Sequence, residues 1–204
     1  MKTKKTLSIR RMTSLAILIA LVAVLQVISL VPINPIVGIT LALAPIVVGA
    51  ILFGPISGAF LGAVMGAVVF ISVVMGQAGA LSTAMLQLNP IVTFLVCILK
   101  SSFAGLASGL VYRAIAKTGK QTLAIIIAAI VCPIVNTGLF VAALLTVFHS
   151  VAAEYAALSD ASMAKFVIVM ILGVNFILEF VINSALSPAI VRIISIVRKS
   201  KLAQ

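Results

Sequence analysis

Long runs of apolar residues, separated by short polar segments, dominate the pattern along the chain. Six such runs predict membrane helices, at residues 12–31, 39–53, 55–75, 90–112, 122–148 and 164–191. A helix that crosses the hydrocarbon core of a bilayer needs about 20 mostly apolar residues. The pattern therefore predicts an all-α integral membrane protein, with six transmembrane helices in a single domain that covers residues 1–204.

The uncharged stretch from Ile39 to Met75 is too long to be one membrane helix. At about 1.5 Å per residue it would extend about 55 Å, whereas the hydrocarbon core is about 30 Å thick. Gly54 and Pro55 mark the expected break, because glycine favours the end of a helix and proline favours the first turn of the next. We therefore predict a helical hairpin.

The N-terminal head, MKTKKTLSIRR, resembles the basic region of a signal peptide. The apolar run that follows is longer than the apolar region of a signal peptide, and no A-x-A-like cleavage site follows it. We interpret this run as a retained membrane helix.

Composition supports the membrane assignment, since 64% of the residues are hydrophobic and only 8% are charged. A soluble domain carries roughly a quarter charged residues. This chain has too few to cover a water-exposed surface, so lipid must be its main solvent. The two cysteines, Cys97 and Cys132, fall inside apolar runs and indicate small core residues, with no disulfide or metal site.

The charge pattern predicts the orientation. The formal net charge is +11, from 14 Lys and Arg residues against 3 Asp and Glu residues. All basic residues except Lys100 and Lys165 fall in the N-terminal head, between the fourth and fifth runs, or in the C-terminal tail. Because basic residues accumulate on the cytoplasmic side, we predict that both termini are cytoplasmic. No motif for binding nucleic acid is present, so we expect no nucleic-acid partner.

Glycines recur at every fourth position around the third run, at Gly54, Gly58, Gly62 and Gly66. Helices in lipid associate through close backbone approach, which small residues permit. We predict a helix-packing seam along this row. The alternative is that glycine is simply frequent in membrane helices.

Two charged residues, Lys100 and Glu179, fall inside apolar runs. Charged groups in hydrocarbon are costly and are candidates for function. Both residues are expected at a similar depth, so they could form a buried ion pair with no other role. Alternatively, they line a substrate pocket in which Lys100 meets an anionic ligand.

Neutral polar residues accompany these charges. Asn136 and Thr137 follow a proline in the fifth run, and Asn175 and Asn183 lie one helical turn either side of Glu179. Amides in lipid need partners, so these side chains face either another helix or a substrate cavity. Three further candidates for substrate contact are expected in the outward loops: Asn34, Gln87 and Asn89.

Motifs for catalysis are missing. The chain has no Walker A loop, no H-E-x-x-H motif and no G-x-S-x-G motif. His149 stands alone at the end of the fifth run, which favours an interfacial residue over a metal ligand. We expect neither an enzyme nor a cofactor.

Several segments together resemble the substrate-binding S component of energy-coupling factor (ECF) vitamin transporters. They are the basic head with SLAILIALVAVLQ, the hairpin LAPIVVGAILFGPISGAFLGAVMGAV, the segment KSSFAGLASGLVYRAIAK, and the final NFILEF and LSPAIVR. The resemblance covers nearly the whole chain. It implies a six-helix protein of a prokaryotic plasma membrane that captures a vitamin or related micronutrient from outside.

The resemblance also implies partners. An S component docks on a membrane coupling subunit that two ABC-type ATPases drive. Ala16 and Ala20 match the A-x-x-x-A docking motif of the family's first helix, although they could instead serve packing within the chain. The riboflavin branch usually has an Asp where this chain has Ala44. Lys100 and the asparagines suit a small, polar, anionic vitamin, and pantothenate is the leading candidate.

Two other classes of function fit the same apolar pattern. A membrane scaffold would keep the glycine row and need no pocket. A carrier acting alone would move its substrate without a coupling subunit. Binding of a small molecule in detergent distinguishes an S component from a scaffold, and transport in liposomes identifies a carrier.

Overall fold

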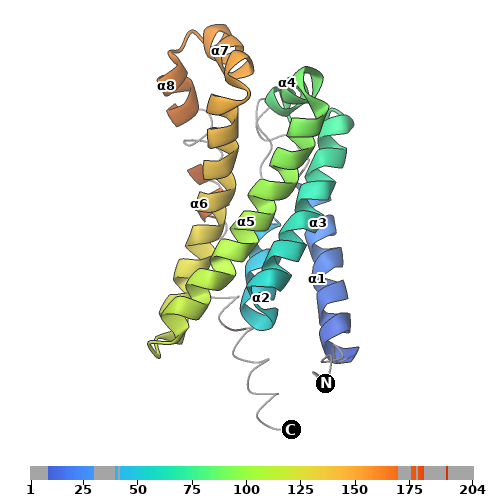
Figure 1. Ribbon diagram of the computed structural model, residues 1–204, viewed down its shortest axis with the longest axis vertical. Coiled ribbons are helices and arrows are strands. Elements are labelled where there is room, and N and C mark those ends of the chain that lie inside the picture. The colour runs from blue at the N-terminus through green and yellow to red at the C-terminus, as the bar shows by residue number, and fades with distance from the viewer. Residues whose placement is uncertain are drawn as a thin grey trace, which may run out of the picture.

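The computed structural model describes residues 9–29, 40, 42–169, 176–177, 179–181 and 192. These residues form helices and contain no strand (Figure 1), which confirms the prediction of an all-α protein. The helices are α1 (Ile9–Ile28), α2 (Leu43–Phe53), α3 (Pro55–Val74), α4 (Ala80–Leu88), α5 (Pro90–Ala116), α6 (Gln121–Thr146), α7 (His149–Leu158) and α8 (Met163–Phe166).

Four helices are long and apolar enough to cross a membrane: α1, α3, α5 and α6. This finding confirms the prediction of an integral membrane protein. The apolar helix α2 is shorter, with 11 residues. Most of the sixth predicted span lies outside the described residues, so the count of six spans stays a prediction.

The turn between α2 and α3 consists of Gly54 alone. α2 ends at Phe53 and α3 begins at Pro55, with Gly54 at a φ of 103° between them. Residues with a Cβ atom rarely adopt a positive φ, whereas glycine does so readily. Proline at the first position of α3 loses nothing, because its missing N–H would have no partner within the helix.

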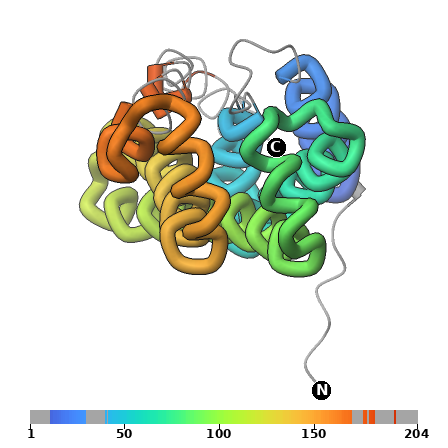
Figure 2. The backbone as a smooth tube through the Cα atoms, turned by 90° about the horizontal axis from the view of Figure 1, so that it is seen from above, coloured from blue at the N-terminus to red at the C-terminus, as the bar shows by residue number. Residues whose placement is uncertain are grey.

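α2 lies at the centre of the described helices. It contacts α1, α3, α5 and α6, and Figure 2 shows it between α6 on one side and α3 with α1 on the other. Every residue from Leu43 to Ile51 is buried. A helix that is apolar all round fits such a central position, where each of its faces meets another helix.

The two ends of the bundle differ. At one end lie the α2–α3 and α5–α6 turns, which we call the turn end (Figure 1). At the other end, here called the capped end, α4 and α7 contact each other. Both short helices occur in segments expected as polar loops. Each buries an apolar face against the bundle, with Leu81 and Met85 on α4 and Val151 and Ala152 on α7.

α3 and α5 approach each other along the glycine row. A Cβ atom on Gly58 would lie 2.5 Å from the Gly105 carbonyl oxygen, closer than real Cβ atoms come to any atom. A Cβ atom on Gly62 would meet the backbone of Ser101, and one on Gly66 would meet the α5 backbone one turn further along. The two backbones are therefore in direct contact over several turns, which small residues permit in lipid.

Candidate functional site

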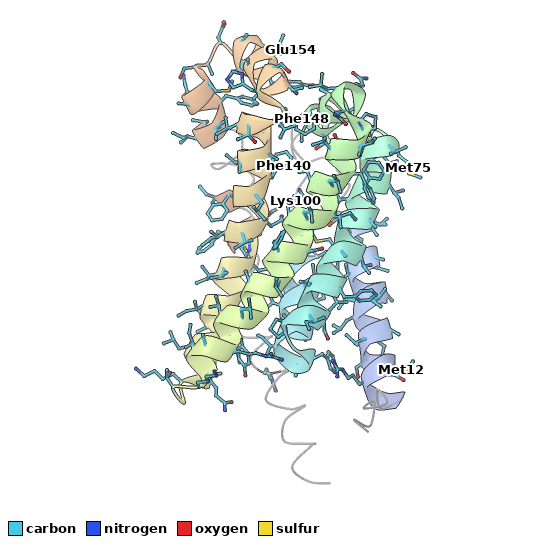
Figure 3. The ribbon with its side chains drawn as sticks, viewed as in Figure 1. Met12, Met75, Lys100, Phe140, Phe148 and Glu154 are labelled. Atoms are coloured by element: carbon cyan, nitrogen blue, oxygen red, sulfur yellow. The ribbon has the colours of Figure 1, made fainter. Side chains whose placement is uncertain are left out.

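Lys100 projects from α5 toward α6. Its Nζ atom lies 4.7 Å from the centroid of the Phe140 ring on α6. Figure 3 shows Lys100 between α5 and α6, below Phe140 and Phe148 and well below Glu154 at the capped end. Lys100 is ten residues from the start of α5 at Pro90, or about 15 Å along the helix axis. This distance is about half the thickness of the hydrocarbon core of a bilayer.

Glu179 is buried, with 3% of its surface exposed. Its Oε1 atom accepts a hydrogen bond of 3.0 Å from the backbone N–H of Thr40. Its Oε2 atom accepts one of 3.4 Å from the hydroxyl group of Thr137 on α6. The carboxylate thus links α6 to Thr40, three residues before the start of α2. The Lys100 ammonium group is close enough to this carboxylate to interact with it electrostatically.

Asn136 stands next to Thr137 on α6 and is 2% exposed. Among the described residues, no group donates a hydrogen bond to its Oδ1 atom. Buried polar groups almost always have a partner, and leaving one without a partner costs about 1–3 kcal/mol. Asn136 is the sequence neighbour of Thr137, which binds the buried Glu179 carboxylate, so this amide is a candidate contact for a polar ligand.

α6 contains Pro133, the proline that precedes Asn136 and Thr137. The helix continues through Pro133 without interruption, from Gln121 to Thr146. Near this point the Ser108 hydroxyl of α5 donates a hydrogen bond of 2.9 Å to the Ala128 carbonyl. α5 and α6 are therefore joined by a polar contact on the turn-end side of the site.

Other predicted contact residues lie elsewhere. Gln87 on α4 and Asn89 before α5 are exposed at the capped end, and Asn89 lies about 16 Å from Lys100 along the axis of α5. The Asn89 side chain accepts a hydrogen bond of 3.1 Å from the Val92 N–H and so caps α5. Three candidates, Asn34, Asn175 and Asn183, lie outside the described residues.

Sequence reasoning missed two residues of this region and a buried polar residue on α1. Thr40 contributes a backbone N–H group, which no side-chain pattern reveals. Phe140 is one of many apolar residues in an apolar helix. Gln26 could have been identified in the sequence as a polar residue within the first apolar run. It is 4% exposed, and its Oε1 atom has no hydrogen-bond partner in the described part of the chain.

The predicted docking residues Ala16 and Ala20 are both exposed on α1. Large apolar side chains on the same helix are exposed too, among them Ile17, Leu21 and Val24. Only 11% of the most apolar stretch of α1 is buried, so this helix presents a broad surface of small and apolar residues to its surroundings.

No metal site is seen among the described residues. They contain no group of three or more His, Cys, Asp and Glu side chains placed to hold an ion. Cys97 and Cys132 are buried free cysteines.

The comparisons with known proteins identify the family. A search of curated proteins finds no match. A scan against protein families matches residues 10–191 to the family described as ECF transporter, substrate-specific component. The match spans all the helices described above except the first residue of α1. The chain therefore belongs to the family of ECF transporter substrate-specific components.

Proposed function

We propose that this chain captures a vitamin or related micronutrient for an ECF-type importer, with pantothenate as the leading candidate. Membership of the family supports a substrate-binding role. The observation that carries the proposal is the cluster of Lys100, Glu179, Thr137 and Asn136 inside otherwise apolar helices. Ionisable residues at this depth are costly and mark substrate pathways.

The chemistry of the cluster suits a small ligand with an anionic end and hydrogen-bonding groups. The Lys100 ammonium group would bind a carboxylate. The Asn136 amide oxygen would accept a hydrogen bond from a ligand hydroxyl or amide N–H. Pantothenate offers a carboxylate, an amide and hydroxyl groups. The remaining predicted residues of the pocket are Asn34, Gln87, Asn89, Asn175 and Asn183.

The distribution of charge supports an orientation for the protein. Arg113, Lys117 and Lys120 lie at the end of α5 and in the turn before α6, and therefore at the turn end. Glu154 and Asp160 lie at the capped end. By the positive-inside rule the turn end faces the cytoplasm. We propose six spans with both termini inside, in the plasma membrane of a prokaryote, and substrate entry from the capped end.

Transport requires partners in this proposal. The exposed surface of α1 around Ala16 and Ala20 would dock on the membrane coupling subunit. Small residues there would allow helices of that subunit to approach closely. Two ABC-type ATPases would supply the energy, and this chain would bind substrate without hydrolysing ATP.

The test is to identify what the purified protein retains. The chain is expressed alone, purified in detergent and denatured, and the released small molecules are identified by mass spectrometry. One vitamin at a stoichiometric amount supports the proposal and names the substrate. An empty protein that also fails to bind pantothenate and a panel of other vitamins contradicts it and favours a scaffold.

A matched pair of variants tests the site. Lys100→Met should weaken binding of radiolabelled pantothenate by about 1–3 kcal/mol, because a ligand carboxylate loses its cation. Lys165→Met, at an exposed residue near the capped end, should bind as the wild type does. Unchanged affinity in a folded Lys100→Met protein would contradict the role given to Lys100.

A further inference from the structure

We propose that Phe140 determines the charge specificity of the substrate site. Its ring holds the Lys100 ammonium group inside the bundle, and the site therefore selects ligands that carry a carboxylate or a similar anionic group. The inference rests on the proposed function, because it assigns the ligand class of that same site.

The first step is the reach of the lysine. Lys100 is ten residues from the start of α5 at the capped end, whereas Phe140 is six residues from the end of α6 at Thr146. These separations correspond to about 15 Å and about 9 Å along the helix axes. The Lys100 side chain therefore extends toward the capped end to place its ammonium group over the Phe140 ring.

The second step is the strength of the contact. The distance of 4.7 Å from Nζ to the ring centroid lies within the limit of about 6 Å for a cation–π interaction. Such interactions are strongest where water is excluded. Lys100 is only partly exposed and Phe140 is 8% exposed, so little water competes. A long lysine side chain in a membrane otherwise extends to the nearest interface. The ring offers it a closer partner.

The third step is the rigidity of the ring. Phe140 belongs to a buried apolar cluster at the capped end, which also contains Leu81 of α4, Leu144 of α6 and Phe166 of α8. Phe148 and Val151 extend this cluster to α7. Close packing restricts the ring to one orientation, so its face offers a fixed position to the ammonium group.

The fourth step is the difference between the two charges of the site. The Glu179 carboxylate already accepts hydrogen bonds from Thr40 and Thr137. Within the part of the chain that the structure describes, the ammonium group of Lys100 has the ring as its near partner and donates no hydrogen bond. The N–H groups of Lys100 are thus available to an anion, while Glu179 is engaged. A ligand carboxylate can join the ammonium group without displacing it from the ring.

The experiment compares two ligands that differ in one group. Pantothenate carries a carboxylate, and pantothenol carries a neutral hydroxyl group in its place. Binding of both to the full chain in detergent is measured by calorimetry for the wild type, Phe140→Leu and Phe140→Tyr. Phe103→Leu serves as the matched control, since Phe103 is 48% exposed on α5.

We expect Phe140→Leu to weaken pantothenate binding about tenfold and to leave pantothenol binding unchanged. Phe140→Tyr keeps an aromatic face and should retain the preference for pantothenate, as should the Phe103→Leu control. The ratio of the two affinities is measured on the same protein sample, so partial misfolding cannot imitate the effect. An unchanged ratio in Phe140→Leu would overturn the inference.

A second measurement needs no ligand. Lysine side chains are labelled by reductive ¹³C-methylation, and the Lys100 signal is assigned from its loss in Lys100→Met. The Phe140 ring should shift this signal upfield, and the shift should vanish in Phe140→Leu. A signal that Phe140→Leu leaves unchanged would refute the contact. If the shift is present but the wild type binds neither compound, the pantothenate assignment fails and the holding role of Phe140 stands.

Discussion

The two sides of α5 show how differently one membrane helix can use its neighbours. Toward α3 it presents small residues whose backbone touches the backbone of the glycine row, as at Gly58 and Gly105. Toward α6 it presents Lys100, which reaches the Phe140 ring. The first side leaves no room even for a methyl group. The second side keeps a charge and, on α6, a buried amide of Asn136 that lacks a partner.

We interpret the side of α5 that faces α3 as structural and the side that faces α6 as functional. Helices in lipid gain little from apolar contact, so close backbone packing has to hold them together. Buried polar groups without partners reduce stability. A protein that keeps such groups beside a tight seam can tolerate the loss at the site because the seam supplies the stability. We expect substitutions on the two sides of α5 to separate stability from binding.

The largest expected effect is on the α3–α5 seam. Gly62→Leu would place side-chain atoms against the Ser101 backbone, and its Cβ atom would lie 2.9 Å from the Ser102 Cα. Backbone cannot move aside as a side chain can, so we expect more than the about 1–3 kcal/mol typical of overpacking and loss of most folded protein. Fluorescence-detected size-exclusion chromatography after heating measures this loss.

Gly138→Leu is the matched control for the seam. Gly138 lies within α6, and a Cβ atom there would meet nothing within 4 Å. The two variants make the same chemical change in apolar helices, so a difference between them reports the contact alone. If both variants were equally stable, the close approach of α3 and α5 would contribute nothing to stability.

The second largest effect is expected on α1, where the small residues Ala16 and Ala20 are exposed. Ala16→Trp and Ala20→Trp should abolish co-purification with the coupling subunit, because a bulky side chain prevents close helix approach. Both variants should bind pantothenate as the wild type does, since Ala16 and Ala20 are exposed on α1, whereas Lys100 lies on α5 and Asn136 on α6. A complex that survives both substitutions would show that docking uses another surface.

The seam and the site differ in how far they could be predicted from sequence. The all-α membrane class follows from composition and from the length of the apolar runs. Lys100 and Glu179 stand out because a charge in an apolar run has few explanations. On α5, Ser101, Gly105 and Gly109 repeat at the four-residue spacing of the α3 row, so the second half of the seam was open to prediction too.

Other parts of the site could not be predicted from the sequence, because they depend on tertiary contacts. The bond from the Thr40 N–H to Glu179 joins residues 139 positions apart, and every residue except proline has a backbone N–H group to offer. In the sequence Phe140 resembles the other phenylalanines, and its contact with the Lys100 ammonium group is seen only in the structure. The helices α4 and α7 were missed because they are short, with 9 and 10 residues, and helices of that length are marginal without tertiary contacts.

The third prediction asks whether Lys100 and Glu179 serve a ligand or only each other. Glu179→Gln and Lys100→Met should each weaken pantothenate binding by about 1–3 kcal/mol, the range for a buried polar group that loses a partner. The double variant removes both charges and should recover stability, because no buried charge is left in the apolar helices. In our proposal the double variant still fails to bind pantothenate.

The controls for this comparison of single and double variants are measured on the same proteins. Thermal stability without ligand and affinity for pantothenate are compared across the wild type, the two single variants and the double variant. Should the double variant regain both stability and wild-type affinity, the two charges would form a structural ion pair and the site would lie elsewhere.

The smallest expected effect concerns the Asn136 amide. Asn136→Leu replaces a buried side chain, whose oxygen lacks a partner among the described residues, with an apolar side chain of similar volume. If the amide is kept for a ligand, the variant should gain about 1 kcal/mol of stability, since an unsatisfied buried group is removed. It should lose affinity for pantothenate by about tenfold, measured by calorimetry beside the heating assay. Thr146→Val, at an exposed position on α6, should change neither quantity. A less stable Asn136→Leu protein with normal affinity would show that Asn136 stabilises the bundle, as the α3–α5 seam does, and does not bind the ligand.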